Sequence, residues 1–282
     1  LLQLNKTHQV VVLELAMRGP GEIKFLCDIA HPTGAIITNV GEAHLEKLGS
    51  VRNIARAKAE ILDSIPFNGF AVLNIKSPYL KEEASRCRGK VIYFGVDKGP
   101  DIYAVNINKF GKGNKFKAIY GQEEAEFFVP LPGLHNVENA ISAIAIGRQL
   151  GLSYSEIVAG LSNATISGMR MEIIELNNYI IINDTYNANP TSTIAALHSL
   201  QEIAFNRRMV AVLGNMFELG MGSKDGHLRV GKIAALCGVS LLVTVGDLAK
   251  HIAVGAEKAG LSSTGIIICK DNEDAMEKLA HI

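Results

Sequence analysis

The sequence has few cysteines and no excess of charge of either sign. Its four cysteines, Cys27, Cys87, Cys237 and Cys269, are far apart and form no CxxC pair. This spacing argues against a zinc knuckle or a disulfide framework and favours a reducing cytoplasm. Lysine plus arginine and aspartate plus glutamate both total 28, so the bulk charge favours neither nucleic acid nor an anionic membrane as a partner. We therefore expect a small-molecule partner.

Several other signals are missing. No apolar run approaches the roughly 20 residues of a membrane-spanning helix, and the first residues, LLQLNKTHQ, do not have the pattern of a signal peptide. The chain has neither a GxGxxG dinucleotide fingerprint nor a GxxxxGK[ST] phosphate-binding loop. The GKGNK stretch at 111–115 is no such loop, because it lies between two expected hairpin strands. Leu1 is not a start methionine and Ile282 ends an unfinished helical pattern, so we expect a fragment cut at both ends.

The chain contains enough apolar sequence for two α/β domains. It is 282 residues long and 48% hydrophobic, which predicts a globular protein with a substantial core. Short β-branched runs at 10–13, 35–37 and 70–73 alternate with helical patterns, as is typical of parallel strands covered on both faces. The segment 91–129 instead predicts a small antiparallel meander. A second, Rossmann-like alternation follows, with strands expected at 179–182, 209–214, 241–245 and 266–269.

Polar residues follow the first three expected strands. Glu14 follows the first, Thr38 and Asn39 follow the second, and Asn74 follows the third. Ligands of open parallel sheets collect beyond the carboxyl ends of the strands. We therefore expect these side chains to share one edge of the sheet and to form a site there.

A lysine lies on the apolar face of the helix that the pattern predicts from Val51 to Ile65, after Ser50, an N-cap residue type. Two interpretations of this residue, Lys58, are open. Its stem can pack on the core while its amine reaches water. Alternatively, desolvation lowers the pKa of the amine, which then reacts with carbon dioxide to give an anionic carbamate able to hold a cation. His44 lies in the preceding loop, between Glu42 and Glu46, and could meet that anion near a strand end.

A further helix is expected to begin at about His135 or Asn136. Its buried stripe is predicted to consist of Val137, Ala140, Ile141, Ile144, Ala145 and Leu150. His135, Asn136 and Asn139 crowd its first turn. One asparagine is expected to be a cap, but a helix N-terminus also favours phosphate, and an asparagine amide can read the edge of an adenine.

Seven motifs occur in the order in which the Mur ligases carry them. They are VVLELAMRGPGEI, TNVGEAHLEKLGS, IARAKAEIL, LPGLHNVENA, SGMRMEIIE, NDTYNANP and VLGNMFELG. The chain therefore resembles the Mur ligase family over nearly its whole length. The resemblance implies an incomplete central ATP-binding domain at 1–168 and an incomplete Rossmann-like domain at 169–282. Because the phosphate-binding loop of the family is missing, the chain alone is predicted not to turn over, whereas the full-length protein would.

The resemblance also implies a chemistry. Mur ligases use ATP to phosphorylate a carboxylate, and an incoming amine attacks the acyl phosphate, with Mg²⁺ between the reacting anions. The NDTYNANP loop resembles that of the member which adds a terminal dipeptide. The implied substrates are thus UDP-N-acetylmuramoyl-tripeptide and D-Ala-D-Ala, in peptidoglycan precursor synthesis. The resemblance further implies a cytoplasmic monomer that binds neither nucleic acid nor membrane.

By the same resemblance, residues of this chain receive roles. Glu14 and His44 match magnesium ligands, and Lys58 matches the carbamylated lysine of the family. The residues that match its nucleotide contacts are His135, Asn136, Asn139, Arg170 and Asp184. Those expected near the substrate are Thr38, Asn39, Asn187 and Asn189, although turn chemistry before Pro190 also explains the last two. His227 is expected to be a surface histidine.

Three alternatives stay open. The nearest is a different Mur ligase or a folylpolyglutamate synthase-like ligase, from which competition between acceptors would distinguish this protein. The second is a noncatalytic nucleotide-binding relative, against which the joint presence of Glu14, His44 and Lys58 speaks. The third is a metal-dependent hydrolase that uses His44 and a carbamylated Lys58, which lacks further histidine ligands nearby.

Overall fold

The computed structural model describes residues 4–165, here called the N-terminal part, and residues 168–280, the C-terminal part. Leu1 and Ile282, from which we expected a fragment, and Ser167 of the SGMR motif lie outside the described residues. The N-terminal part contains one six-stranded sheet, and the C-terminal part contains a three-stranded sheet and a two-stranded one. No helix among the described residues has the length and apolar character needed to span a bilayer.

The six-stranded sheet is mixed. Its strands follow sequence order and are β1 (Gly34–Ile37), β2 (Phe70–Asn74), β3 (Lys90–Gly95), β4 (Ile102–Phe110), β5 (Gly113–Tyr120) and β6 (Glu123–Val129). The first four pair in parallel, and only β4, β5 and β6 pair antiparallel. The prediction of a separate meander from residue 91 is therefore wrong for β3. The alternating pieces of this segment belong to β4 and β5, and β3 continues the parallel order of β1 and β2 instead. GKGNK does lie at the β4–β5 hairpin, as expected.

The strand expected at 10–13 is absent. These residues have no regular structure, and Val12 is 87% exposed. β-Branched residues favour a strand only where a neighbouring strand supplies hydrogen bonds and a packing surface. Within the described residues, β1 pairs only with β2 and leaves its other edge unpaired.

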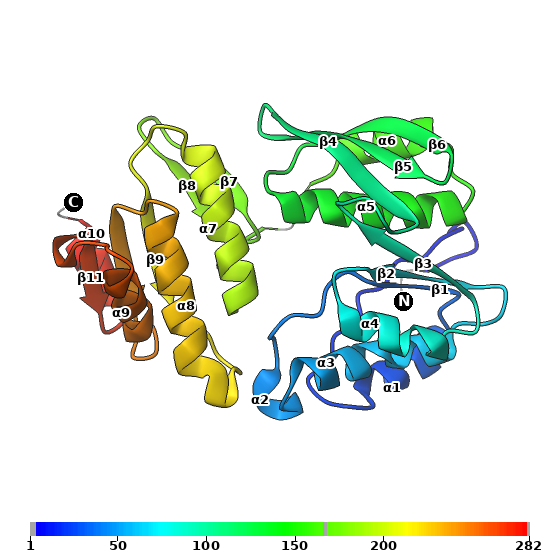
Figure 1. Ribbon diagram of the computed structural model, residues 1–282, viewed down its shortest axis with the longest axis horizontal. Helices are drawn as coiled ribbons and strands as arrows, with labels where there is room; N and C mark the ends of the chain where they lie inside the picture. The colour runs from blue at the N-terminus through cyan, green and yellow to red at the C-terminus, as the bar shows by residue number, and fades with distance from the viewer. Residues whose placement is uncertain (1–3, 166–167, 281–282) are drawn as a thin grey trace.

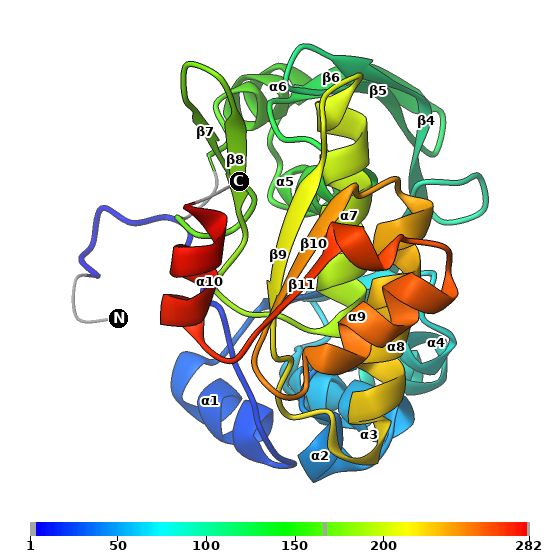
Figure 2. The same cartoon turned by 90° about the vertical axis from the view of Figure 1, so that its left-hand side faces the viewer.

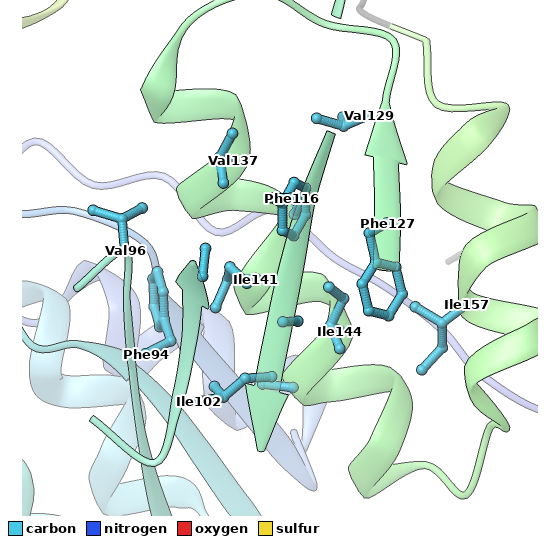
Figure 3. Packing of buried hydrophobic residues seen from close by; sticks show 14 of the residues in the cluster. Phe94, Val96, Ile102, Phe116, Phe127, Val129, Val137, Ile141, Ile144 and Ile157 are labelled. Carbon is cyan, nitrogen blue, oxygen red and sulfur yellow. The ribbon is translucent and has the colours of Figure 1, made fainter. Parts of the chain in front are cut away.

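Helices cover both faces of this sheet. Its main helix is α5 (Leu134–Gln149), which lies on the face formed by β2 to β6 together with α6 (Tyr154–Ser162). Figure 3 shows Val137, Ile141 and Ile144 of α5 against Phe94 and Phe116 of the sheet. The opposite face of β1 and β2 is covered by a 3₁₀ helix, η1 (Ala59–Ser64), and by α4 (Pro78–Glu83), which is followed by η2 (Ala84–Arg86).

Three short helices form a separate apolar cluster beside the sheet. They are α1 (Glu22–Ala30), α2 (Leu45–Leu48) and α3 (Val51–Lys58). The helix predicted over 51–65 is therefore real but divided, because its backbone tightens from α to 3₁₀ geometry after Lys58. Lys58 is the last residue of its α-helical section.

The C-terminal part is Rossmann-like, as predicted. Its parallel sheet has the order β11 (Ile266–Cys269), β10 (Leu241–Val245) and β9 (Val210–Gly214). One face packs on α7 (Pro190–Ala204), α8 (Ser223–Leu236) and α9 (Lys250–Lys258), and the other face packs on α10 (Asn272–Leu279), as Figure 2 shows. Two 3₁₀ turns, η3 (Gly220–Gly222) and η4 (Ser263–Gly265), precede α8 and β11.

The strand expected at 179–182 belongs to another sheet. It forms β8 (Ile180–Asn183), which pairs antiparallel with the unpredicted β7 (Glu172–Glu175). Asn177 and Asn178 form the turn between them, and the backbone N–H of Leu176 donates to the carbonyl oxygen of Tyr179 at 2.9 Å. Two asparagines between apolar runs are a hairpin signal that the sequence interpretation overlooked. Figure 1 shows the two parts side by side, with α7 facing α5.

Ile144 and Leu150 provide a matched test of core packing. Ile144 is fully buried, whereas Leu150, predicted on the same stripe, follows the end of α5 and is 45% exposed. We expect Ile144→Ala to lower the free energy of unfolding by about 2–5 kcal/mol, because it leaves a cavity. Leu150→Ala should change it by at most about 0.5 kcal/mol. Urea unfolding followed by circular dichroism measures both, and equal losses would contradict this assignment of the core.

Candidate functional site

A buried asparagine joins the carboxyl ends of β1 and β2. Asn74 is 3% exposed, and its Nδ2 donates to the carbonyl oxygen of Thr38 at 2.8 Å. Its Oδ1 accepts the backbone N–H of Lys76 at 2.9 Å. Because both ends of its amide are bonded, Asn74 fixes the two strand ends relative to each other. The residues Thr38 and Asn39 lie beyond this edge and are exposed.

Lys58 reaches the same edge from α3. Ser50 caps that helix as predicted, by accepting the backbone N–H of Asn53 at 3.1 Å. The amine of half-buried Lys58 donates to the carbonyl oxygen of Asn39 at 2.9 Å. Loss of hydration lowers the pKa of Lys58. The neutral amine is therefore more accessible here than in a solvated lysine.

The loop after β1 carries His44 to the boundary between the two parts. The Nδ1–H of His44 donates to Oε2 of Glu218, which belongs to the C-terminal part, at 2.5 Å. Glu42 forms an ion pair with Arg229 across the same boundary. The backbone N–H of Glu46 also donates to the carbonyl oxygen of Glu218, at 3.0 Å. Figure 1 shows the result, with α2 beside the start of α8.

A cavity of about 280 Å³ lies where this loop meets the C-terminal part. Its lining residues are Arg18, Ala43, His44, Asn187, Ala188, Asn189, Phe217 and Glu218. Three predicted site residues, His44, Asn187 and Asn189, are thus brought together from distant parts of the sequence. The cavity offers an imidazole, amides, a carboxylate and an arginine, which suits a polar and charged ligand.

The two asparagines of the cavity also shape its wall. Asn189 is the N-cap of α7, and its Oδ1 accepts the backbone N–H of Ser192 at 3.0 Å. The Oδ1 of Asn187 accepts the backbone N–H of Ala188 at 2.8 Å. Pro190 then begins the helix, a position at which its missing N–H costs nothing. The turn chemistry expected for these two asparagines is confirmed. The same two residues also line the cavity.

The three candidate residues in the first turn of α5 differ in how deeply they are buried. Asn136 is buried, and its Nδ2 donates to the carbonyl oxygen of Pro132 at 2.7 Å, which fastens the loop before the helix. Asn139 is exposed, and His135 is half-buried. Loss of hydration lowers the pKa of His135, and the carboxylate of Asp184 opposes this effect. The carboxylate of Asp184, in the C-terminal part, thus acts electrostatically on a histidine of the N-terminal part.

Arg170 and Asp184 are held by one compact arrangement of backbone. Oδ1 of Asp184 accepts the backbone N–H of Met171 at 3.0 Å, and the carbonyl oxygen of Met169 accepts that of Tyr186 at the same distance. The guanidinium of Arg170 lies 4.0 Å from the centre of the Tyr186 ring. Met169 and Met171 have φ values of 61° and 50°, which non-glycine residues seldom adopt. The backbone on both sides of Arg170 is thus held in an uncommon conformation.

Glu14 does not end a strand, although the sequence predicted that it would. It is exposed in an irregular segment, and the described hydrogen bonds join it neither to His44 nor to Lys58. Across residues 4–165 and 168–280, no three His, Cys, Asp or Glu side chains are grouped as a metal site. The donors nevertheless fit a divalent cation chemically. Lys58 has the lowered pKa that carbamate formation needs, and His44 has one ring nitrogen held by a carboxylate, as metal-binding histidines commonly do.

His227 is not the surface histidine that the sequence predicted. It is fully buried, and its Nε2 accepts the backbone N–H of Met216 at 3.0 Å while its Nδ1–H donates to the carbonyl oxygen of Ser223 at 2.6 Å. Burial also lowers its pKa. The interpretation failed because the sequence does not show that the chain after β9 folds back over α8.

Besides two alanines, three residues of the cavity were not predicted from the sequence. Arg18, Phe217 and Glu218 line it, and all three lie within the motifs VVLELAMRGPGEI and VLGNMFELG. The motifs were therefore a usable signal. They do not show which of their polar residues face the opposite part of the molecule.

Comparison with known proteins relates the whole chain to one family. Residues 1–147 match the Mur ligase middle domain, and residues 169–282 match the Mur ligase, glutamate ligase domain. The chain is 35% identical over 258 residues to UDP-N-acetylmuramoyl-tripeptide–D-alanyl-D-alanine ligase of Bacillus subtilis, covering 91% of this chain and 55% of that protein. It is 33% identical to the Escherichia coli ligase of the same name, covering 91% of this chain and 57% of that protein.

Solved structures give the same relationship. The structure of MurF from Acinetobacter baumannii superposes with a TM-score of 0.90 and 32% identity, over 99% of this chain and 60% of that one. MurF from Thermotoga maritima in complex with ADP, at a TM-score of 0.76 and 23% identity, shares the fold. The chain spans little more than half the length of the two curated relatives, at 55% and 57%.

Replacing Lys58 with methionine tests whether its amine is desolvated. The pKa of Lys58 is lower in the folded than in the unfolded state, so between these two values the unfolded chain binds more protons and stability rises with pH. We expect the free energy of unfolding of the wild type to increase relative to that of Lys58→Met as pH approaches the ordinary lysine pKa from below. Urea unfolding at several pH values, in bicarbonate-free buffer, measures this difference. Parallel pH profiles would show that the amine is fully hydrated.

Proposed function

Because the chain belongs to the Mur ligase family, we propose that the whole protein is an ATP-dependent ligase of peptidoglycan precursor synthesis. It joins D-Ala-D-Ala to UDP-N-acetylmuramoyl-tripeptide through an acyl phosphate. The observation that carries this proposal is Lys58, whose amine has a lowered pKa and meets the carbonyl oxygen of Asn39 at the carboxyl edge of the sheet. The loop that begins at this edge continues to Ala43 and His44 at the cavity.

The lowered pKa gives Lys58 a specific task. Its neutral amine can attack the carbon of carbon dioxide, so that an N–C bond forms, one C–O π pair moves onto oxygen and the amine proton leaves to solvent. The resulting carbamate replaces a positive charge with a negative one. We propose Glu14, His44 and carbamylated Lys58 as ligands of Mg²⁺. When bound, this cation neutralises charge between the γ-phosphate and the substrate carboxylate.

The remaining site residues have positioning tasks. We propose that His135, Asn136, Asn139, Arg170 and Asp184 bind the nucleotide. The electrostatic effect of Asp184, in the C-terminal part, on His135, in the N-terminal part, supports this. Thr38, Asn39, Asn187 and Asn189 are proposed to contact substrate. For Asn187 and Asn189 the support is their place in the wall of the cavity.

The same proposal includes the domain bounds, the oligomeric state and the cellular location of the protein. We propose a first domain at 1–168 and a second at 169–282, and a monomer in the cytoplasm, where the four free cysteines would remain reduced. The 282 residues alone are expected not to turn over, because they contain no GxxxxGK[ST] loop.

The choice of acceptor tests the proposed reaction. The whole protein is incubated with ATP, Mg²⁺ and UDP-N-acetylmuramoyl-tripeptide, together with D-Ala-D-Ala, D-Ala or L-glutamate, and ADP and product masses are measured. We expect ADP and a dipeptide-extended product only with D-Ala-D-Ala. Extension by L-glutamate would favour the folylpolyglutamate synthase-like alternative. Nucleotide binding without any product would favour a noncatalytic relative.

Lys58→Ala tests the proposed carbamate. In the whole protein we expect activity to fall by at least about 100-fold, because a charge placed for the transition state is removed. Short carboxylic acids should partly restore it by occupying the position of the carbamate. Lys81→Ala, which removes an exposed lysine of α4, is the control and should retain activity. If Lys58→Ala keeps normal turnover, Lys58 is structural and the proposed roles of Glu14 and His44 must be revised.

A further inference from the structure

Glu218 connects to the loop of His44 through two different groups. Its carboxylate accepts the Nδ1–H of His44 at 2.5 Å, and its carbonyl oxygen accepts the backbone N–H of Glu46 at 3.0 Å. It also lines the cavity between the two parts. Neither the sequence nor the proposed function has given this residue a task.

The backbone at both ends of this contact is unusual. His44 has a φ of 63° and Glu218 has a φ of 61°. Side-chain-bearing residues pay an energetic cost in this left-handed region, and such conformations persist where the surroundings enforce them and often mark functional sites. Here the two unusual conformations occur at the two residues whose side chains bond to each other. The arrangement therefore places an imidazole and a carboxylate together from opposite parts of the chain.

We propose that Glu218 is a positioning residue for His44. By accepting the Nδ1–H, its carboxylate fixes the orientation of the ring and selects the tautomer in which Nε2 has a free lone pair. This inference rests on the proposed function in one respect, which is that the lone pair of Nε2 binds the cation. Because Glu218 belongs to the C-terminal part, the ring is oriented only while the two parts are together.

A second contact across the boundary provides the control. Arg229 pairs with Glu42 but has no described contact with His44 or with Glu218. Removing this ion pair weakens the association of the two parts without removing the acceptor of the histidine proton. Glu218→Ala and Arg229→Gln therefore separate the orientation of His44 from the general strength of the interface.

The tautomer of His44 is the deciding measurement. In the whole protein labelled with ¹⁵N-histidine, at a fixed alkaline pH, two-bond ¹⁵N–¹H correlations identify the protonated ring nitrogen, and His44→Gln assigns the signal. We expect Nδ1–H in the wild type and in Arg229→Gln, and a shift towards Nε2–H in Glu218→Ala. Glu218→Gln should retain much of the Nδ1–H form, because its amide oxygen can still accept. An Nε2–H wild type, or an unchanged tautomer in Glu218→Ala, would overturn the proposal.

Binding of Mn²⁺ in place of Mg²⁺ separates this inference from the proposed function. Electron paramagnetic resonance of Mn²⁺ with a non-hydrolysable ATP analogue measures affinity without turnover. We expect Glu218→Ala to weaken Mn²⁺ binding by about 10–100-fold, and Arg229→Gln to leave it nearly unchanged. A tautomer shift with unaltered Mn²⁺ affinity would support the positioning of the ring by Glu218 while removing His44 from the proposed metal ligands. A whole protein that forms no ligation product would refute the ligase but not the tautomer result.

Discussion

The packing of α5 on the mixed sheet is the constraint on which the site depends. Its apolar residues fill one face from β2 to β6, which places its first turn at the boundary with the C-terminal part. Gly133, just before the helix, has a φ of 86°, and a Cβ there would lie 2.5 Å from Oγ of Ser199 in α7. A side chain here would be strained by the positive φ and would crowd Ser199, so glycine favours this approach of the two parts. The burial of α5 thus fixes the position of its first turn, which carries His135, at this boundary.

A second constraint is the chemistry of the strand ends. Asn74 satisfies its amide between Thr38 and Lys76, and Lys58 ends on the carbonyl oxygen of Asn39. Both side chains are therefore bonded to backbone near the edge of the sheet, at which α/β proteins collect ligands. The loop after β1, which carries His44, leaves the sheet at this edge. The bonds of Asn74 and Lys58 hold the start of this loop without any contribution from the C-terminal part.

The sequence predicted the features that depend on local pattern. It did not predict those that depend on contacts between residues far apart in the chain. The cap at Ser50, the helix of His135 and the strands β9, β10 and β11 all follow from periodicity and cap chemistry. The asparagine cap expected at the start of α5 is wrong, because the N-cap there is Gly133. A strand at 10–13 was expected from β-branched residues alone, but it has no partner within the described residues. His227 was expected at the surface because its sequence neighbours do not show that the preceding segment, after β9, covers it. Glu218 was overlooked for the same reason, since its partner His44 lies 174 positions away.

Ion pairs and hydrogen bonds connect the two parts, whereas each described apolar core cluster lies within one part. The polar contacts include the ion pairs of Glu42 with Arg229 and of Lys112 with Glu175, besides the bond of His44 to Glu218. Partly exposed charge pairs are screened by dissolved ions, whereas the apolar cores of the two parts are not. Ionic strength should therefore loosen the boundary well before it affects either core. The salt content of its surroundings would thus influence how often the two halves of the site meet.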